Sequence, residues 1–236
     1  ARYAGGPACW AALRDFATGT RGPAALRLAA YAALILDEQE PPGLKRVWDG
    51  EGWDEMFPIG FVVDDTPTSV EPSEAQRIQE QAAVLIRQNQ GAKAEPLLRR
   101  AAALKPEASD ITYNLAVSLM LQQREDEAMD LIRAVHARDP DYFFARIALA
   151  REALADGRLD EAKELVEPLR RLKRVHNSEF GALMGFDVEL AIEQRRFQRA
   201  EHVLEVLEQT LPGYHTLPGL RAKLDRATPP LEPRRW

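Results

Sequence analysis

Small and aliphatic residues recur at a fixed spacing from about residue 75 onward, and no other feature of the sequence constrains the fold as strongly. Ala94, Ala128 and Ala162 stand 34 residues apart, and Ala200 follows 38 residues after the third. An aliphatic residue stands four positions beyond each alanine: Leu98, Ile132, Val166 and Leu204. Self-similarity at a period of tens of residues is typical of units that stack on one another. The sequence therefore predicts an array of similar units.

The residues between these positions indicate what each unit is. Proline stands twelve residues beyond the alanine at Pro106, Pro140 and Pro212, with Arg174 at the equivalent place in the third unit. Small residues let two antiparallel helices approach closely, and proline, which lacks an N–H, ends the second helix. In these positions the chain resembles the tetratricopeptide repeat over roughly residues 75–212. The resemblance implies an all-α solenoid of about four helix-turn-helix units.

Start and stop signals place the expected helices. The pairs are 74–89 with 92–104, 109–122 with 125–138, 142–155 with 159–173, and 178–194 with 197–210. A further helix over Leu217–Arg226 is expected to cover the end of the solenoid. Gln81 and Asp187 replace a leucine of the pattern, which suggests terminal units exposed on one side. Four extra residues near Val175–Ser178 imply a longer turn before the last unit.

The first seventy residues do not follow the repeat. Two helices are expected over Pro7–Phe16 and Pro23–Leu36, and the second is apolar almost all round and should be buried. Arg46–Trp48 and Trp53–Met56 flank turn residues and indicate a β-hairpin with Trp48 opposite Trp53. Phe57–Val63 is a candidate third strand. We therefore expect a helical pair with a β-hairpin over 1–70, a repeat domain with a capping helix over 71–227, and a tail over 228–236.

Composition and charge exclude several classes of function. Aromatic residues make up only 7% of the chain, which disfavours an all-β fold. Asp37–Glu74 holds eleven acidic and two basic residues, whereas basic and acidic residues balance from Ala75 onward. Duplex nucleic-acid binding needs a basic field, so no nucleic-acid partner is expected. No apolar run is long enough to span a membrane.

The chain also lacks the patterns of a metal, cofactor or catalytic site. Its four histidines are scattered, and there is no GxSxG elbow or glycine-rich phosphate loop. The single cysteine, Cys9, excludes an intrachain disulfide, fits a reducing compartment such as the cytoplasm, and is expected to be buried beside Trp10. We therefore expect no cofactor, no metal and no enzymatic activity.

The resemblance implies a concave groove lined by the first helix of each pair, where a peptide or protein partner binds. The positions that fall on it, and that we take as candidate ligand residues, are Gln79, Arg87, Tyr113, Val117, Phe144, Ile147, Arg151 and Glu189. The lysines and asparagines with which chaperone-binding members hold a C-terminal carboxylate are missing here. The strongest hypothesis is that Tyr113, Phe144 and Arg151 share one partner surface.

A second surface and several other functions stay open. Trp48 and Trp53 form either a cap on the first repeat or a recognition site, and Arg170, Arg171, Lys173 and Arg174 form either a solvated helix end or a docking site for an acidic partner. The alternatives to a scaffold are a self-associating structural protein, the regulatory repeat region of a larger enzyme, and an RNA-binding surface. The chain begins at Ala1 rather than methionine, so a leader or another domain before it also stays open.

Overall fold

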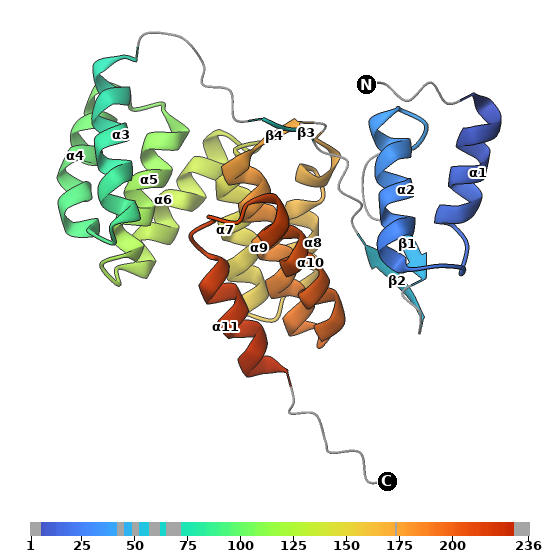
Figure 1. The fold of residues 1–236 in the computed structure, drawn as a ribbon. Coiled ribbons are helices and arrows are strands. Elements are labelled where there is room, and N and C mark those ends of the chain that lie inside the picture. Colours follow the sequence, from blue (N-terminus) through green and yellow to red (C-terminus); the bar gives the residue numbers. More distant parts are fainter. Residues whose placement is uncertain are drawn as a thin grey trace. The chain divides into compact units, whose positions relative to one another are not determined.

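The computed structural model describes residues 6–41, 45–48, 52–56, 62–64, 72–172 and 174–228. They form two compact units, one of Ala1–Asp65 with Val166–Phe180 and one of Thr66–Leu165 with Gly181–Trp236 (Figure 1). The boundary expected near residue 70 and almost all of the expected tail lie outside the described residues.

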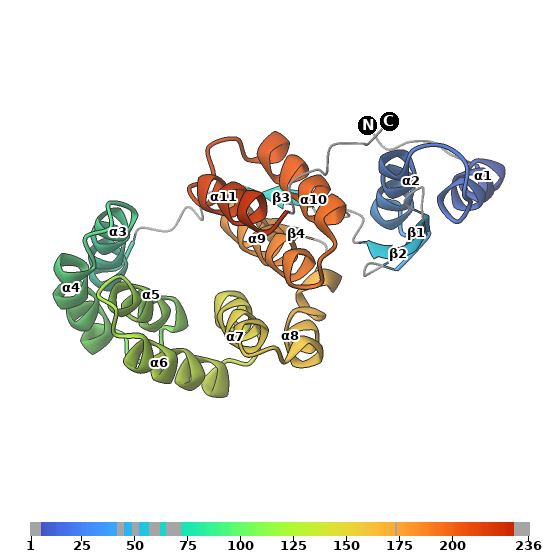
Figure 2. The same ribbon diagram turned by 90° about the horizontal axis from the view of Figure 1, so that it is seen from below.

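Helices form the repeat region. They are α3 Glu74–Arg87, α4 Gly91–Leu104, α5 Ser109–Met120, α6 Glu125–Arg138, α7 Phe143–Ala155, α8 Leu159–Val166, α9 Asn177–Glu193, α10 Phe197–Thr210 and α11 Leu217–Ala227. Neighbours along the chain pack together from α3 to α7, and α11 packs on α10. In Figure 2, α3, α5 and α7 follow one another on the inner side of a curved row, and α4, α6 and α8 lie on its outer side. The all-α repeat solenoid expected from the sequence is confirmed.

The repeated positions are the core of this region. The four alanines that define the repeat, and the aliphatic residues four positions beyond them, are all fully buried. Alanine is small enough to let the paired helices approach, and the larger aliphatic residue fills the space one turn further along. The 34-residue spacing therefore arises because each helical pair buries the same positions in its packing contacts.

Helix α8 ends earlier than expected. It stops at Val166 rather than near residue 173, because Pro168 lacks an N–H and disfavours a helical conformation in the residue before it. A short 3-10 helix, η1 Leu169–Arg171, and strand β4 Arg174–His176 follow. The extra residues near Val175 are thus a strand that leads directly into α9, and the expected longer turn is wrong.

The first unit combines helices and short strands. It contains α1 Pro7–Ala17, α2 Ala24–Leu36, β1 Lys45–Trp48, β2 Trp53–Met56 and β3 Val62–Asp64. Strands β1 and β2 pair antiparallel with Trp48 opposite Trp53, and their rings lie 5.7 Å apart edge to face. The expected hairpin is confirmed. The fully buried Arg27 of α2 ties the hairpin to this helix by donating to the carbonyl oxygen of Trp48. It also donates, at 2.7 Å, to the carbonyl oxygen of Arg21 in the connection before α2.

The third expected strand has a different partner. Val62–Asp64 pairs in parallel with Arg174–His176 and not with the hairpin. Residues 57–61 of the expected strand lie outside the described residues. A parallel pair needs a long connection, and here the connection carries α3 to α8.

Three expectations about burial are wrong. Cys9 is exposed, because α1 buries little more than the face that carries Trp10 and Ala17. Helix α2 is not buried all round: Leu26 and Leu36 are exposed, whereas the face that includes Tyr31 and Leu34 is in the core. Asp187, expected on an exposed terminal unit, is buried, because α9 is surrounded along most of its length.

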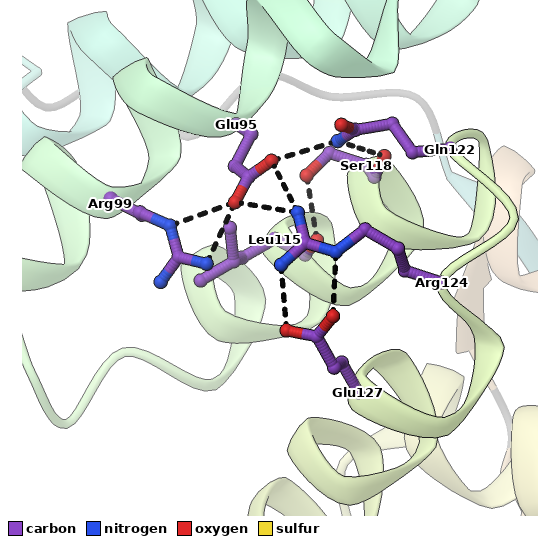
Figure 3. Close-up of polar contacts among 7 residues, drawn as sticks. All are labelled: Glu95, Arg99, Leu115, Ser118, Gln122, Arg124 and Glu127. Carbon is purple, nitrogen blue, oxygen red and sulfur yellow. Dashed lines mark hydrogen bonds and ion pairs between the residues drawn. The ribbon is translucent and has the colours of Figure 1, made fainter.

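A network of charged side chains joins the first two repeats (Figure 3). Glu95 of α4 accepts hydrogen bonds from Gln122 Nε2 at 2.9 Å, from Arg99 Nη2 at 2.7 Å and from Arg124 Nη1 at 2.9 Å. Arg124 also donates to Glu127 of α6 at 2.6 Å. Bonds from Gln122, Arg99 and Arg124 lower the pKa of Glu95 to about 2, because they stabilise its charged form.

We expect this network to make stability depend on pH in the acid range. Because the pKa of Glu95 is lower in the folded state, its contribution is complete above about pH 4.5 and is lost as the pH falls toward about 2. Glu95→Gln should lower the free energy of unfolding at pH 7 by about 1–2 kcal/mol. In this variant the free energy of unfolding should also fall less steeply between pH 4.5 and pH 2 than it does in the wild type. Urea unfolding at a series of pH values measures both effects.

The matched control is Glu107→Gln, because the side chain of Glu107 is exposed and its ion pair with Arg138 is long, at 3.9 Å. It should unfold as the wild type does at every pH. If Glu95→Gln declined with pH as steeply as the wild type, Glu95 would not be the group whose protonation weakens the fold.

Candidate functional site

Aromatic side chains from two repeats meet on α5 and α7. The ring of Tyr113 stacks on that of Phe144 with 5.6 Å between centroids, and Tyr142 lies edge-on to Tyr113 at 5.7 Å. Tyr113 and Phe144 are half-buried, so part of each side chain is open to a partner. Contacts of this kind contribute about 0.5–1.5 kcal/mol beyond the burial itself. The structure thus brings two of the three residues of the main hypothesis into contact.

The third residue, Arg151, forms an ion pair with another candidate. Its Nε donates to Oε2 of Glu189 on α9 at 2.8 Å. Lys223 of α11 approaches the other oxygen, Oε1, at 3.6 Å. The side chains of Arg151 and Lys223 are 39% and 41% exposed, and that of Glu189 is 18% exposed. Arg151 and Glu189 were predicted to line the groove, but the contribution of Lys223 was not.

A row of positions on α9 explains how the segment after the repeats reaches this place. Gly181, Gly185 and Glu189 are four residues apart and so lie on one face of the helix. The ring of Tyr214 lies so close to Gly181 that a β-carbon there would stand 2.4 Å from it. At Gly185 a β-carbon would stand 3.3 Å from Nη2 of Arg151 and 3.5 Å from Leu220 of α11. Because Gly181 and Gly185 carry no side chain, Tyr214, Leu220 and Arg151 can pack closely against α9.

This arrangement changes the expected groove. We use "first-helix face" for the surface that carries Tyr113, Phe144, Arg151 and Glu189. At the fourth repeat this face is covered by Tyr214 and by α11, which was expected only at the end of the solenoid. The sequence signal for the cover is the pair of glycines one turn apart inside a helix.

Burial and the charge of Arg151 shift the pKa values of two tyrosine hydroxyls in opposite directions. Burial raises the pKa of Tyr113 and of Tyr214 above the usual value, and the positive charge of Arg151 partly opposes the rise in both. Both hydroxyls therefore stay protonated at neutral pH.

The other candidate groove residues differ in how accessible they are. Gln79 of α3 donates to Asp110 of α5 at 2.9 Å, so it helps to join the first two repeats. Arg87 is exposed at the last residue of α3, and Val117 is half-buried on α5. Ile147 is buried and packs within the repeats, so it is not open to a ligand in this structure.

The residues of the possible second surface differ in how exposed they are. Trp53 is exposed, with the guanidinium of Arg46 5.2 Å from its ring centroid, and Trp48 is half-buried. Arg170 is buried, whereas Arg171 is exposed and pairs with Glu167 at 3.4 Å. Arg174 is exposed in β4, and Lys173 lies outside the described residues. The basic run is therefore split between a buried side chain and exposed ones.

A pocket of about 480 Å³ lies elsewhere, between α6, α7 and α8. Its cations are already paired with its own carboxylates, Arg133 with Glu152 and Arg158 with Glu161. Where the structure describes the chain, no group of three or more histidine, cysteine, aspartate or glutamate residues is placed to hold a metal ion. No described helix combines the length and apolar character needed to cross a membrane.

Comparison with known proteins identifies the repeat. The family model described as tetratricopeptide repeat matches residues 85–144 and 121–185. No curated protein matches the sequence. The matched residues include Tyr113, Phe144 and Arg151.

Proposed function

Because residues 85–185 match the family model of the tetratricopeptide repeat, we propose that the chain is a non-catalytic scaffold that binds a peptide or protein segment on the first-helix face. Repeats of this family generally mediate protein–protein interaction. Stacked helical pairs present an extended surface on their first helices, and side chains on that surface select the partner.

The observation that carries this proposal is the half-buried stack of Tyr113 on Phe144 on the same face as Arg151. Aromatic residues and arginine are the residue types that most often dominate the affinity of protein interfaces. Covering the exposed part of each ring with a partner would remove further apolar surface from water. The stack is also held by contacts between repeats, so little order has to be gained on binding.

We expect a Phe144→Ala/Arg151→Glu variant to lose the partner that the wild type binds. The substitutions remove one ring of the stack and reverse the charge on this face, which together should weaken binding by at least about a hundredfold. Affinity capture from the native lysate, followed by identification of the retained proteins, measures the loss. Circular dichroism establishes that the variant is folded.

Lys163→Glu is the matched control, because it reverses one charge at an exposed position of α8 away from this face. It should retain the wild-type set of proteins. If the double variant also retained that set, binding would not use the first-helix face. Capture of the chain alone would favour self-association.

The hairpin is the second candidate interaction site. Trp53 is exposed and Arg46 lies over its ring, which is a common arrangement at binding anchors. A partner that is retained by the Phe144→Ala/Arg151→Glu variant but lost by Trp53→Ala would place the interaction on the hairpin.

A further inference from the structure

Two cations on the first-helix face share a single carboxylate. Arg151 and Lys223 both approach Glu189, so these three side chains carry a net charge of +1. In the bond to Glu189 the guanidinium uses Nε, and arginine has further N–H groups to donate. The 3.6 Å from Lys223 Nζ to Glu189 is too long for a hydrogen bond, so its three donors also remain for another acceptor.

The remaining N–H groups of Arg151 lie beside Gly185 of α9. While Nε is held by Glu189, Nη2 lies against Gly185, one turn nearer to Gly181 and the ring of Tyr214. Arg151 follows Phe144 by seven residues on α7 and so lies on the same face of that helix, and Phe144 stacks on Tyr113. The first-helix face therefore carries a positive charge beside a pair of aromatic side chains. Glu193, the next carboxylate along this face, is four residues beyond Glu189 and so lies in the opposite direction from Gly185.

The segment after the repeats is part of this surface. Tyr214 lies on Gly181, Leu220 contacts the Gly185 position, and Lys223 pairs with Glu189. Arg221 fixes α11 on α10 through hydrogen bonds to Glu208 at 3.0 Å. Because α11 is held on two helices, Tyr214 and Lys223 have defined positions before any partner arrives.

From this geometry, and resting on the proposed function, we infer that the partner segment is acidic and carries an aromatic side chain, and that Tyr214 and Lys223 complete its binding site. A carboxylate of the segment pairs with Arg151 and Lys223. Its aromatic side chain packs beside Tyr113, Phe144 and Tyr214. The C-terminal helix thus contributes specificity as well as covering the last repeat.

Synthetic peptides test this inference directly. The probe is a fluorescent peptide with a central phenylalanine flanked by glutamates, and its binding is followed by fluorescence anisotropy. Two matched peptides replace either the glutamates with glutamine or the phenylalanine with alanine. We expect either replacement to weaken binding to the wild-type protein by at least about tenfold. Added salt should weaken the binding of the acidic peptide more than that of the glutamine peptide.

Variants of the protein separate a local effect from a change of net charge. Lys223→Glu should bind the acidic peptide at least about tenfold more weakly than the wild type does, and Lys223→Arg should bind it with the wild-type affinity. Lys93→Glu makes the same change of charge at an exposed position of α4 and should leave the affinity unchanged.

The inference is overturned if the glutamine peptide binds as tightly as the acidic one, or if Lys223→Glu and Lys93→Glu have equal effects. It is also overturned if the partner lost by the Phe144→Ala/Arg151→Glu variant binds through a neutral or basic segment. In that last case the proposed function stands and only the chemistry of the partner is wrong.

Discussion

Replacing Gly91 with alanine should lower the free energy of unfolding by about 3 kcal/mol. Gly91 begins α4, and a β-carbon on it would stand 2.5 Å from the carbonyl oxygen of Ser118 and 2.8 Å from Cβ of Leu121. These atoms belong to the backbone of the next repeat or lie next to it, so they cannot move aside alone. The added methyl group must push α4 and α5 apart and loosen the core around Ala94 and Leu98.

Gly219→Ala makes the same substitution where there is room for it. Gly219 lies in the first turn of α11, and no atom comes within 4 Å of a β-carbon placed there. Because alanine favours a helix more than glycine does, this variant should be unchanged or up to about 1 kcal/mol more stable. Urea unfolding of both variants gives the two values. A loss at Gly91 no larger than the change at Gly219 would show that α4 and α5 tolerate a side chain between them.

Gly181→Ala should lower the free energy of unfolding by about 2 kcal/mol, for a different reason. Here the atoms in the way belong to the ring of Tyr214, at 2.4 to 2.8 Å from the new β-carbon. A ring on a short connection can be displaced, but it then loses the burial that raises its hydroxyl pKa. The main cost is therefore the contact between α9 and the segment before α11.

A double-mutant cycle isolates this contact. Because Tyr214→Ala removes the ring, adding Gly181→Ala to it should cost little, and the two changes should be less than additive by about 1–2 kcal/mol. Gly213→Ala is the control, since no atom comes within 4 Å of a β-carbon there and the variant should unfold like the wild type. Strict additivity of Gly181→Ala and Tyr214→Ala would mean that the ring does not lie on Gly181.

Most of the repeat region could be predicted because its signals are local and recur. The buried alanines and the aliphatic residues one turn later fixed each helical pair, and the start of α6 at Glu125 was placed correctly. The end of α8 was predicted wrongly, although Pro168 is a signal for it. The second helix of the third pair was given about the same length as the second helices of the other pairs. The hairpin could be predicted since two tryptophans flank a turn of suitable length.

The cover on the first-helix face could not be predicted in the same way. It depends on contacts between Gly181 and Tyr214 and between Glu189 and Lys223, and none of these residues belongs to the repeat pattern. A helical glycine indicates that something lies close but not which residue does. The candidates Tyr113, Phe144 and Arg151 were found because the family pattern assigns them a face, whereas Tyr214 and Lys223 follow the last repeat.

The pairing of β3 with β4 sets a condition on how such a chain can evolve. Val62–Asp64 and Arg174–His176 lie side by side, so everything between them is a closed loop that leaves and returns to one place. Arrays of this kind commonly gain or lose units, because each unit contacts only its neighbours. In this chain β4 stands between the third and fourth helical pairs and is also bound to β3 by three residue pairs. A change in the number of helical pairs between α3 and α8 must therefore keep this parallel pairing, which a simple repeat array does not contain.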